Sequence, residues 1–185
     1  MDIRLAYSAD SQEIDIVPNG PDLAMDHTLE TAVLISLFSN RRAESDDILP
    51  DPTMDRQGWW GDEFSSVDGD LTGSRFWLLT AAKQTQETLL KYEEYAQEAL
   101  QWMLDDSVAS DIQIQAEYQR QNVLALAIQI YRGSQVSQQY QFLWDLLAQE
   151  LLPGDENLPI LGSKNYLVTE DDSNIDTENG DRLIL

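Results

Sequence analysis

The sequence predicts an α+β fold, and three observations support that prediction. Two segments repeat apolar residues every three or four positions, as amphipathic helices do, and five others alternate apolar and polar residues, as half-buried strands do. Hydrophobic residues make up 42% of the 185 residues, which is enough for one core and leaves little room for a second. We therefore expect an N-terminal β-hairpin, two main helices, a C-terminal antiparallel three-stranded sheet and an extended acidic tail.

The N-terminal hairpin is predicted over residues 3–7 and 12–17, which alternate weakly and have turn-forming residues between them. Residues 18–21 read Pro-Asn-Gly-Pro and interrupt this pattern. Asp26 then stands where the N-cap of a helix accepts hydrogen bonds from free backbone N–H groups. We expect the first helix from about His27 to Asn40, with a broad apolar face.

A long segment without periodicity, Arg41 to Gly73, follows the first helix and surrounds the adjacent pair Trp59 and Trp60. Segments of this length are usually functional or packed around their own aromatic residues. An exposed pair could stack on sugars or bases, whereas a buried pair would anchor the loop. Because the chain is so acidic, we favour the interpretation that the pair anchors the loop. We expect structural roles for four tryptophans: Trp59, Trp60, Trp77 and Trp102.

The second helix is predicted from Thr85, a capping residue, to about Leu104, because apolar residues recur there at spacings of three and four. After the acidic pair Asp105 and Asp106, residues 112–118 and 124–130 each alternate with period two. The residues between them, Gln-Arg-Gln-Asn, predict a hairpin turn.

A third strand is predicted over residues 135–142, where Val136, Tyr140 and Phe142 share one parity. We expect a short helix from there to Leu152, and a helix throughout 136–152 is the competing interpretation. Pro153 and Gly154 end the compact part of the chain. The predicted division is therefore a domain over residues 1–152 and an acidic C-terminal arm over residues 153–185.

The charge of the chain excludes several classes of partner. Thirty-four acidic residues against eleven lysines and arginines give a formal net charge of -23, which repels phosphate and anionic lipid. We therefore expect no nucleic acid and no membrane as a partner. No segment resembles a signal peptide or is apolar for long enough to cross a bilayer, so we expect a soluble, unprocessed protein.

Candidate catalytic and metal-binding residues are scarce. The chain has no cysteine, which excludes disulfides, thiolate metal sites and a cysteine nucleophile. His27 is its single histidine, and a position in the first turn of a helix suits a surface or capping role. The glycines of the segments GWWG (58–61) and DGDLTG (68–73) are not followed by the residues of a phosphate-binding loop. We expect no catalytic residue, no cofactor and no metal.

Four blocks of sequence resemble the Mu-like bacteriophage tail baseplate protein family. They are LETAVLISLFSNRRA at 29–43, RQGWWGD at 56–62, GSRFWLL at 73–79 and EEYAQEALQWMLDD at 93–106. That family is related to the lysozyme-named baseplate wedge, or sheath-initiator, component of contractile tails. The resemblance covers roughly residues 1–150. After the second helix, where the wider family often has an acidic residue, a proline and an arginine, this chain has DDSVASD.

The resemblance implies a structural, non-enzymatic protein of the virion, present in several copies around the tail axis and assembled in the bacterial host cytoplasm. Its implied partners are other baseplate wedge proteins, the tail sheath subunit, and the tail tube or central hub. The implied mechanism is β-strand sharing, which seeds the sheath. A chain with an exposed strand edge is suited to this, because main-chain hydrogen bonds supply the affinity.

For this mechanism we expect an interface at the edge strand 135–142, with Val136, Tyr140 and Phe142. Arg42 and Arg75 are further interface candidates, which would pair with acidic groups in the loop or on a neighbouring subunit.

Two other functions compete with the structural role. A peptidoglycan-degrading glycoside hydrolase would need two carboxylates across a cleft, and acidic pairs such as Asp105 and Asp106 are abundant. In so acidic a chain, however, such pairs usually form a solvated face. An acidic adaptor that mimics nucleic acid is suggested by the charge alone.

Overall fold

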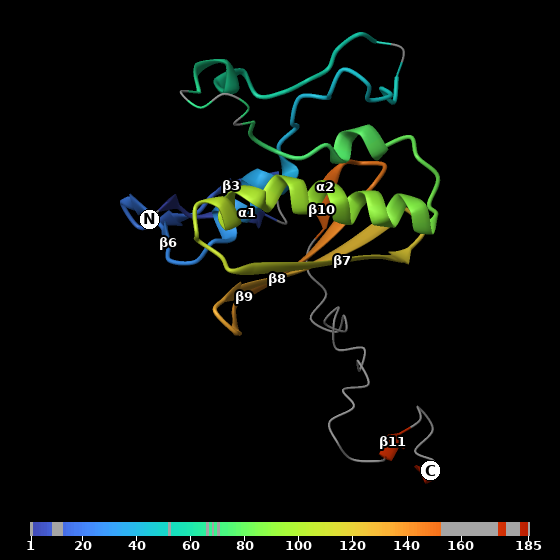
Figure 1. Ribbon diagram of the computed structural model, residues 1–185. Coiled ribbons are helices and arrows are strands. Elements are labelled where there is room, and N and C mark those ends of the chain that lie inside the picture. Colours follow the sequence, from blue (N-terminus) through green and yellow to red (C-terminus); the bar gives the residue numbers. More distant parts are fainter. Residues whose placement is uncertain are drawn as a thin grey trace.

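The computed structural model describes residues 2–8, 13–51, 53–65, 67, 69, 71–152, 174–176 and 182–184. An N-terminal group of short strands comes first, followed by two α-helices separated by a long loop, and then by a larger sheet (Figure 1). In chain order the elements are β1 (Asp2–Ile3), β2 (Leu5–Ser8), β3 (Glu13–Ile16), β4 (Pro18–Asn19), β5 (Asp22–Leu23), β6 (Met25–Asp26), α1 (Glu30–Phe38), η1 (Trp60–Phe64), η2 (Phe76–Leu79), α2 (Gln86–Asp105), β7 (Asp111–Arg120), β8 (Val123–Arg132), β9 (Gln135–Asp145), β10 (Glu150–Leu152), β11 (Asn174–Asp176) and β12 (Arg182–Ile184).

The larger sheet has four antiparallel strands in the order β10-β9-β8-β7. The strands β7 and β8 are joined by the predicted tight turn, in which Asn122 has a φ of 62°. Asparagine tolerates this left-handed conformation better than most residues, which suits a two-residue hairpin turn. The predicted strands 112–118 and 124–130 are confirmed, and each is longer at both ends.

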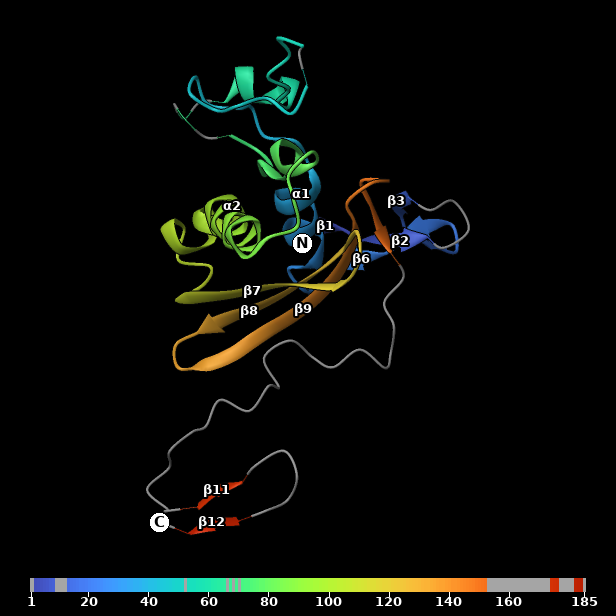
Figure 2. The ribbon, with the colours of Figure 1, turned by 90° about the vertical axis from the view of Figure 1, so that its right-hand side faces the viewer.

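The helices α1 and α2 cover one face of this sheet (Figure 2). On β8 the side chains that face the helices are each at most 1% exposed, and they lie at every second position: Leu124, Leu126, Ile128 and Ile130. On the opposite face, the small side chains of Ala125 and Ala127 pack with Leu143. The core therefore lies between a single layer of helices and a single layer of strands.

The helix predicted from Thr85 to about Leu104 is confirmed as α2. Thr85 is its N-cap, and the Thr85 hydroxyl accepts a hydrogen bond from the backbone N–H of Thr88 at 3.3 Å. The apolar positions that predicted the helix are buried against the sheet and against η2: Leu89, Tyr92, Ala96, Ala99 and Met103.

The first helix, α1, is shorter than predicted, and its N-cap is Leu29 rather than Asp26, although Asp26 still bonds to N–H groups at the start of the helix. The Asp26 carboxylate accepts hydrogen bonds from the N–H groups of Thr28 at 2.7 Å and of Thr31 at 2.9 Å. The Tyr140 hydroxyl on β9 accepts a hydrogen bond from the N–H of Leu29 at 3.0 Å. The start of α1 is thus held both by Asp26, which precedes it in the sequence, and by Tyr140 of the sheet.

The predicted N-terminal hairpin is confirmed as β2 paired with β3, with Leu5 opposite Ile16. Thr31 of α1 connects this region to the helices. The hydroxyl of Thr31 accepts a hydrogen bond from the N–H of Leu5 at 3.1 Å and donates one to the carbonyl of Ile3 at 3.2 Å.

The C-terminal sheet has four strands rather than three, and the short helix expected before Leu152 is wrong, as is the competing helix over 136–152. The strand β9 continues to Asp145, where the carboxylate accepts hydrogen bonds from the N–H groups of Leu147 and Ala148. This turn, with Gln149 at a φ of 56°, sends the chain back as β10. Leu151 lies opposite Trp144 and is buried there, which favours a strand rather than a helix over Glu150–Leu152.

In the predicted acidic arm, the described strands β11 and β12 pair antiparallel. The rest of the arm over residues 153–185 lies outside the described residues.

Substituting Asp26 tests its role at the start of α1. Burial alone would raise the pKa of Asp26, but hydrogen bonds from Thr31 and Thr28 outweigh burial and hold the pKa below its ordinary value of 3.8. The resulting stabilisation is present above the pKa of the unfolded chain and is lost as pH falls through the folded-state pKa. We expect Asp26→Asn to lower the free energy of unfolding by about 1 kcal/mol at pH 7.

Urea denaturation at pH 7 and near pH 3 should show this difference from the unsubstituted chain becoming smaller at the lower pH. The exposed Asp22→Asn is the matched control. An equal effect of the two substitutions at pH 7 would contradict the proposed role of Asp26.

Candidate interaction site

The outer edge of β9 is open over most of its length. The short strand β10 pairs only with residues Leu143–Asp145 of β9. No other described strand lies beside Gln135–Tyr140 on that side. The segment Gln135–Trp144 also contains neither a charged residue nor a proline, in a chain whose net charge is -23. Charges and prolines are two common protections of strand edges, and this segment has neither.

The opposite edge of the sheet, formed by β7, is protected. The carboxylate of Glu93 on α2 accepts a hydrogen bond from the backbone N–H of Ala116 at 2.9 Å. The strand itself includes charged residues, among them Glu117 and Arg120. A strand added to this edge would have to displace a helix side chain, whereas one added to β9 would not.

Alternating hydrogen bonds along the strands fix which groups of β9 point outward. Residue pairs in an antiparallel ladder alternately exchange both main-chain hydrogen bonds or neither. The N–H of Ala116 donates to Glu93, so Ala116 and its partner Leu126 exchange neither main-chain hydrogen bond. The main-chain groups of Leu126 therefore point to β9 and bond there. The partner of Leu126 there is Phe142, which therefore points its N–H toward β8. By alternation, Gln139 points its N–H and C=O outward.

The side chains of Tyr140 and Phe142 point to the core rather than to a partner. Besides bonding to Leu29, Tyr140 stacks on Phe142 with ring centroids 6.2 Å apart. Phe142 also meets the edge of the Phe38 ring on α1 at 5.4 Å. By the same alternation their main-chain N–H and C=O groups point to β8, so these two residues would serve an interface only by holding β9 in place.

Val136 lies on the other face of the sheet, contrary to the parity predicted from sequence. The pairing shifts at this point: Tyr131 is opposite Val136, whereas the preceding Ile130 is opposite Gln138. The extra residue on β9 is a β-bulge, which turns the side chain of Val136 away from the helices. Val136 is 47% exposed.

Arg75 ties the long loop to α2. Its guanidinium bonds to Asp47 in the loop at 3.0 Å and to Glu98 on α2 at 2.9 Å, and it lies 4.6 Å from the centre of the Tyr95 ring. Burial alone would lower the pKa of Arg75, but the two carboxylates outweigh it and raise the pKa. Arg41 adds a longer contact of 3.6 Å to Glu98.

Arg42, the other arginine predicted at an interface, is exposed. Its guanidinium donates to the carbonyl of Gln57 at 3.5 Å, and none of the described carboxylates forms an ion pair with it. Of the two candidates, Arg75 thus contacts its own chain, and Arg42 presents its charge to solvent.

The four tryptophans fall into two groups. Trp77 is buried and donates to the carbonyl of Arg41 at 2.8 Å, and Trp102 donates to the hydroxyl of Ser36 at 3.1 Å. Trp59 and Trp60, by contrast, are 49% and 73% exposed. The expectation that this pair anchors the loop by burial is wrong, because ion pairs and main-chain bonds hold the loop instead.

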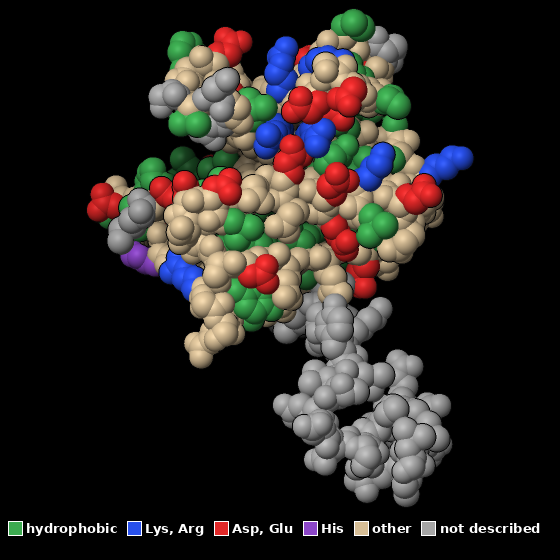
Figure 3. Space-filling model, in the orientation of Figure 1, with side chains coloured by type: hydrophobic (Ala, Val, Ile, Leu, Met, Phe, Trp, Pro, Cys, Tyr) green, Lys and Arg blue, Asp and Glu red, His purple; other side chains and the backbone are tan. Residues whose placement is uncertain are grey.

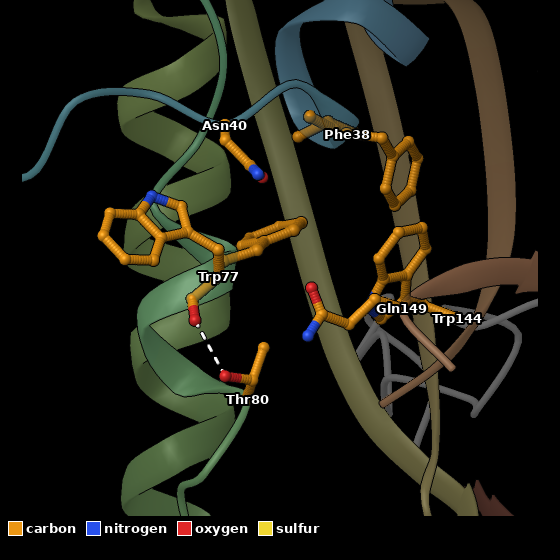
Figure 4. Close-up of a pocket in the computed structure, with 8 residues that line it drawn as sticks. Phe38, Asn40, Trp77, Thr80, Trp144 and Gln149 are labelled. Carbon is orange, nitrogen blue, oxygen red and sulfur yellow. Dashed lines mark hydrogen bonds between the residues drawn. The ribbon is translucent and has the colours of Figure 1, made fainter. Parts of the chain in front are cut away.

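Two cavities stand out in the described part of the protein. One, between η2 and the end of the sheet, has a volume of about 20 Å³, which is room for a single water molecule (Figure 4). It is lined by Phe38, Trp77, Trp144 and the polar residues Asn40, Thr80 and Gln149.

A wider groove of about 730 Å³ lies between α2 and the loop. Its described carboxylates belong to α2 and the residue after it, and so stand on one wall: Glu94, Glu98, Asp105 and Asp106. This arrangement gives no support to a pair of carboxylates facing each other across a glycosidic bond.

Among the described residues, no three acidic or histidine side chains are grouped as metal ligands. Neither helix in that part of the chain is long and apolar enough to cross a membrane.

Arg75→Gln should lower the free energy of unfolding by about 2 kcal/mol, because Asp47 would lose its cation and Glu98 would keep only the longer contact to Arg41. Arg42→Gln, at an exposed position in the same loop, should change it by less than about 0.5 kcal/mol. Urea denaturation of both variants measures the difference, and equal effects would show that the cluster does not hold the loop.

Comparison with known proteins identifies the family. The model of the family described as "Phage protein GP46" matches residues 29–137. The chain is 44% identical over 114 residues to "Baseplate protein gp46" of Escherichia phage Mu, an alignment covering 62% of this chain and 77% of that protein. It is 36% identical over 144 residues to "Mu-like prophage FluMu protein gp46" of Haemophilus influenzae, covering 77% of this chain and 98% of that protein.

The family match spans more than half of the chain and includes the tryptophan pair, η2 and α2. The resemblance to Mu-like phage proteins is therefore confirmed, and this chain belongs to the GP46 family of phage proteins.

Proposed function

We propose that this protein is a structural subunit of a phage tail baseplate, in the wedge or sheath-initiator position of a contractile tail. A relative that is 44% identical is named as the baseplate protein gp46 of phage Mu, which supports the location in the virion. The proposed action is non-enzymatic: the protein lends the edge of β9 to a strand of the first sheath subunit and so starts sheath assembly.

The observation that supports strand sharing most directly is the open edge of β9. Residues Gln135–Tyr140 pair with β8 on one side and have no described strand on the other, and no charge or proline in that segment opposes pairing. An added strand would gain main-chain hydrogen bonds along this edge, beginning at Gln139. Side chains directed to the core, such as Tyr140 and Phe142, keep β9 in place while its outer edge is occupied.

The proposed partners are other baseplate wedge proteins and the tail sheath subunit, with the tail tube or central hub at the centre of the ring. Several copies around the tail axis would present several β9 edges at once. Binding of a ring of sheath subunits then benefits from multivalency, so that each strand contact can be weak while the assembled ring is stable. Assembly would take place in the cytoplasm of the bacterial host.

A substitution at Gln139 tests the role of the edge. Gln139→Pro removes an N–H that points outward and so leaves the bonds between β8 and β9 intact, as prolines on natural edge strands do. Gln139→Thr is the matched control, since it changes the side chain and keeps the N–H. We expect both variants to fold, with similar circular dichroism and thermal unfolding.

The assay is complementation of a phage that lacks this gene, with electron microscopy of the tails. We expect tails with a sheath for Gln139→Thr and baseplates or tubes without a sheath for Gln139→Pro. A folded Gln139→Pro protein that supports normal sheaths would contradict strand sharing at β9.

A further inference from the structure

An aromatic cluster projects from the end of the long loop, far from the edge of β9. The cluster consists of Trp59, Trp60 and Phe64, whose exposed fractions are 49%, 73% and 78%. The ring centroids of Trp59 and Trp60 are 5.6 Å apart, and those of Trp60 and Phe64 are 6.1 Å apart. Hydrophobic side chains are visible at the outer end of the loop in Figure 3.

Two glycines are required for this arrangement. A Cβ atom at Gly61 would overlap the ring of Trp59, which packs directly on the glycine backbone. Gly58 has a φ of 109°, and a Cβ atom there would lie 2.9 Å from the Cβ of Arg42. The sequence Gly-Trp-Trp-Gly is thus explained by local geometry, because the glycines on both sides permit the exposed position of the rings.

The base of the cluster is fixed by hydrogen bonds. The short helix η1 places Trp60 and Phe64 on consecutive turns, and Asp62 accepts a hydrogen bond from the N–H of Thr72 at 3.1 Å, closing the loop. Nearer the core, the N–H of Ala43 donates to the carbonyl of Arg56 at 3.0 Å. Three large rings are therefore held outward at little further cost in conformational entropy on binding.

We propose that the aromatic cluster is a docking anchor for a second protein, one that offers an apolar pocket bordered by lysines or arginines. Tryptophans in exposed clusters commonly dominate the affinity of protein interfaces. The acidic residues Asp55 and Glu63 are exposed close to the cluster in the sequence, and with the net charge of -23 they outweigh the exposed Arg42 beside Gly58 and favour a basic border on the partner.

Other occupants fit these observations less well. A second copy of this chain would bring another net charge of -23 to the interface. A sugar ring stacks on a flat aromatic face, but Trp59 and Trp60 are tilted by 48° and Trp60 and Phe64 by 73°, so the cluster forms no continuous flat platform. A side-chain pocket can enclose tilted rings from several directions.

This inference rests on the proposed baseplate function, since it assigns the cluster to a neighbour in the same assembly. It concerns a different surface from β9, however, so the two can fail separately. The edge of β9 would bind by main-chain hydrogen bonds, and the aromatic cluster by burial of side chains.

Photo-crosslinking in assembled tails identifies the occupant. The photoreactive amino acid p-benzoylphenylalanine replaces Phe64 and, as a control, replaces Leu90, which is 57% exposed on α2. After irradiation of purified tails, mass spectrometry locates the linked peptide. We expect position 64 alone to link to a different tail protein, within a segment that contains lysine or arginine.

Binding to the protein so identified is then measured with purified components. We expect Trp60→Ala to weaken binding roughly tenfold or more, and Leu90→Ala to leave it unchanged. Thermal unfolding of Trp60→Ala should match that of the unsubstituted chain, since this ring is exposed.

Several results would overturn the proposal: a crosslink from position 64 to a second copy of this chain or to a glycan, the absence of any crosslink, or equal affinities of the two alanine variants. Absence of this chain from purified tails would contradict the proposed baseplate function as well. If Gln139→Pro lost its sheaths while Trp60→Ala bound the partner with unchanged affinity, strand sharing would stay supported and only the docking anchor would be contradicted.

Discussion

The packing of α2 against one face of the four-stranded sheet is the interaction on which the rest of the structure depends. It buries the helix-facing side of the inner strand β8 almost completely, and it positions Glu93 against the edge of β7. Because this single layer of helices completes the core, neither the outer edge of β9 nor the end of the long loop is needed for folding. Both can therefore bind neighbours without a cost to the stability of the domain.

The two proposed binding sites differ from the rest of this acidic chain in their lack of charge or their apolar character. The chain carries a net charge of -23, which opposes contact between copies of the protein and limits nonspecific association. Against that background, Gln135–Trp144 is uncharged and the cluster of Trp59, Trp60 and Phe64 is apolar. A subunit in a ring needs at least two directions of contact, and one edge and one projecting loop would supply them.

Much of the fold could be predicted from the sequence because it follows local periodicity. The spacing in α2, the residues Thr85 and Asp26 at the starts of the two helices, and the alternation in β7 and β8 are all visible in the amino-acid order. The bulge that reverses Val136 is not, since it depends on how β9 pairs with β8. The strand β10 is not visible in the amino-acid order either, because its three residues are held by pairing with β9, where Leu151 lies opposite Trp144. The exposure of Trp59 depends on a local turn, about which the overall charge says nothing.

The central claim is that a strand of another protein lies beside β9 in the assembled particle. Electron cryo-microscopy of the baseplate, at a resolution that separates strands, tests this most directly. We expect density of a neighbouring chain about 4.8 Å from Gln135–Tyr140, continuous with the sheet. A map in which that edge faces solvent, or is covered by a helix of a neighbour without strand pairing, would contradict it.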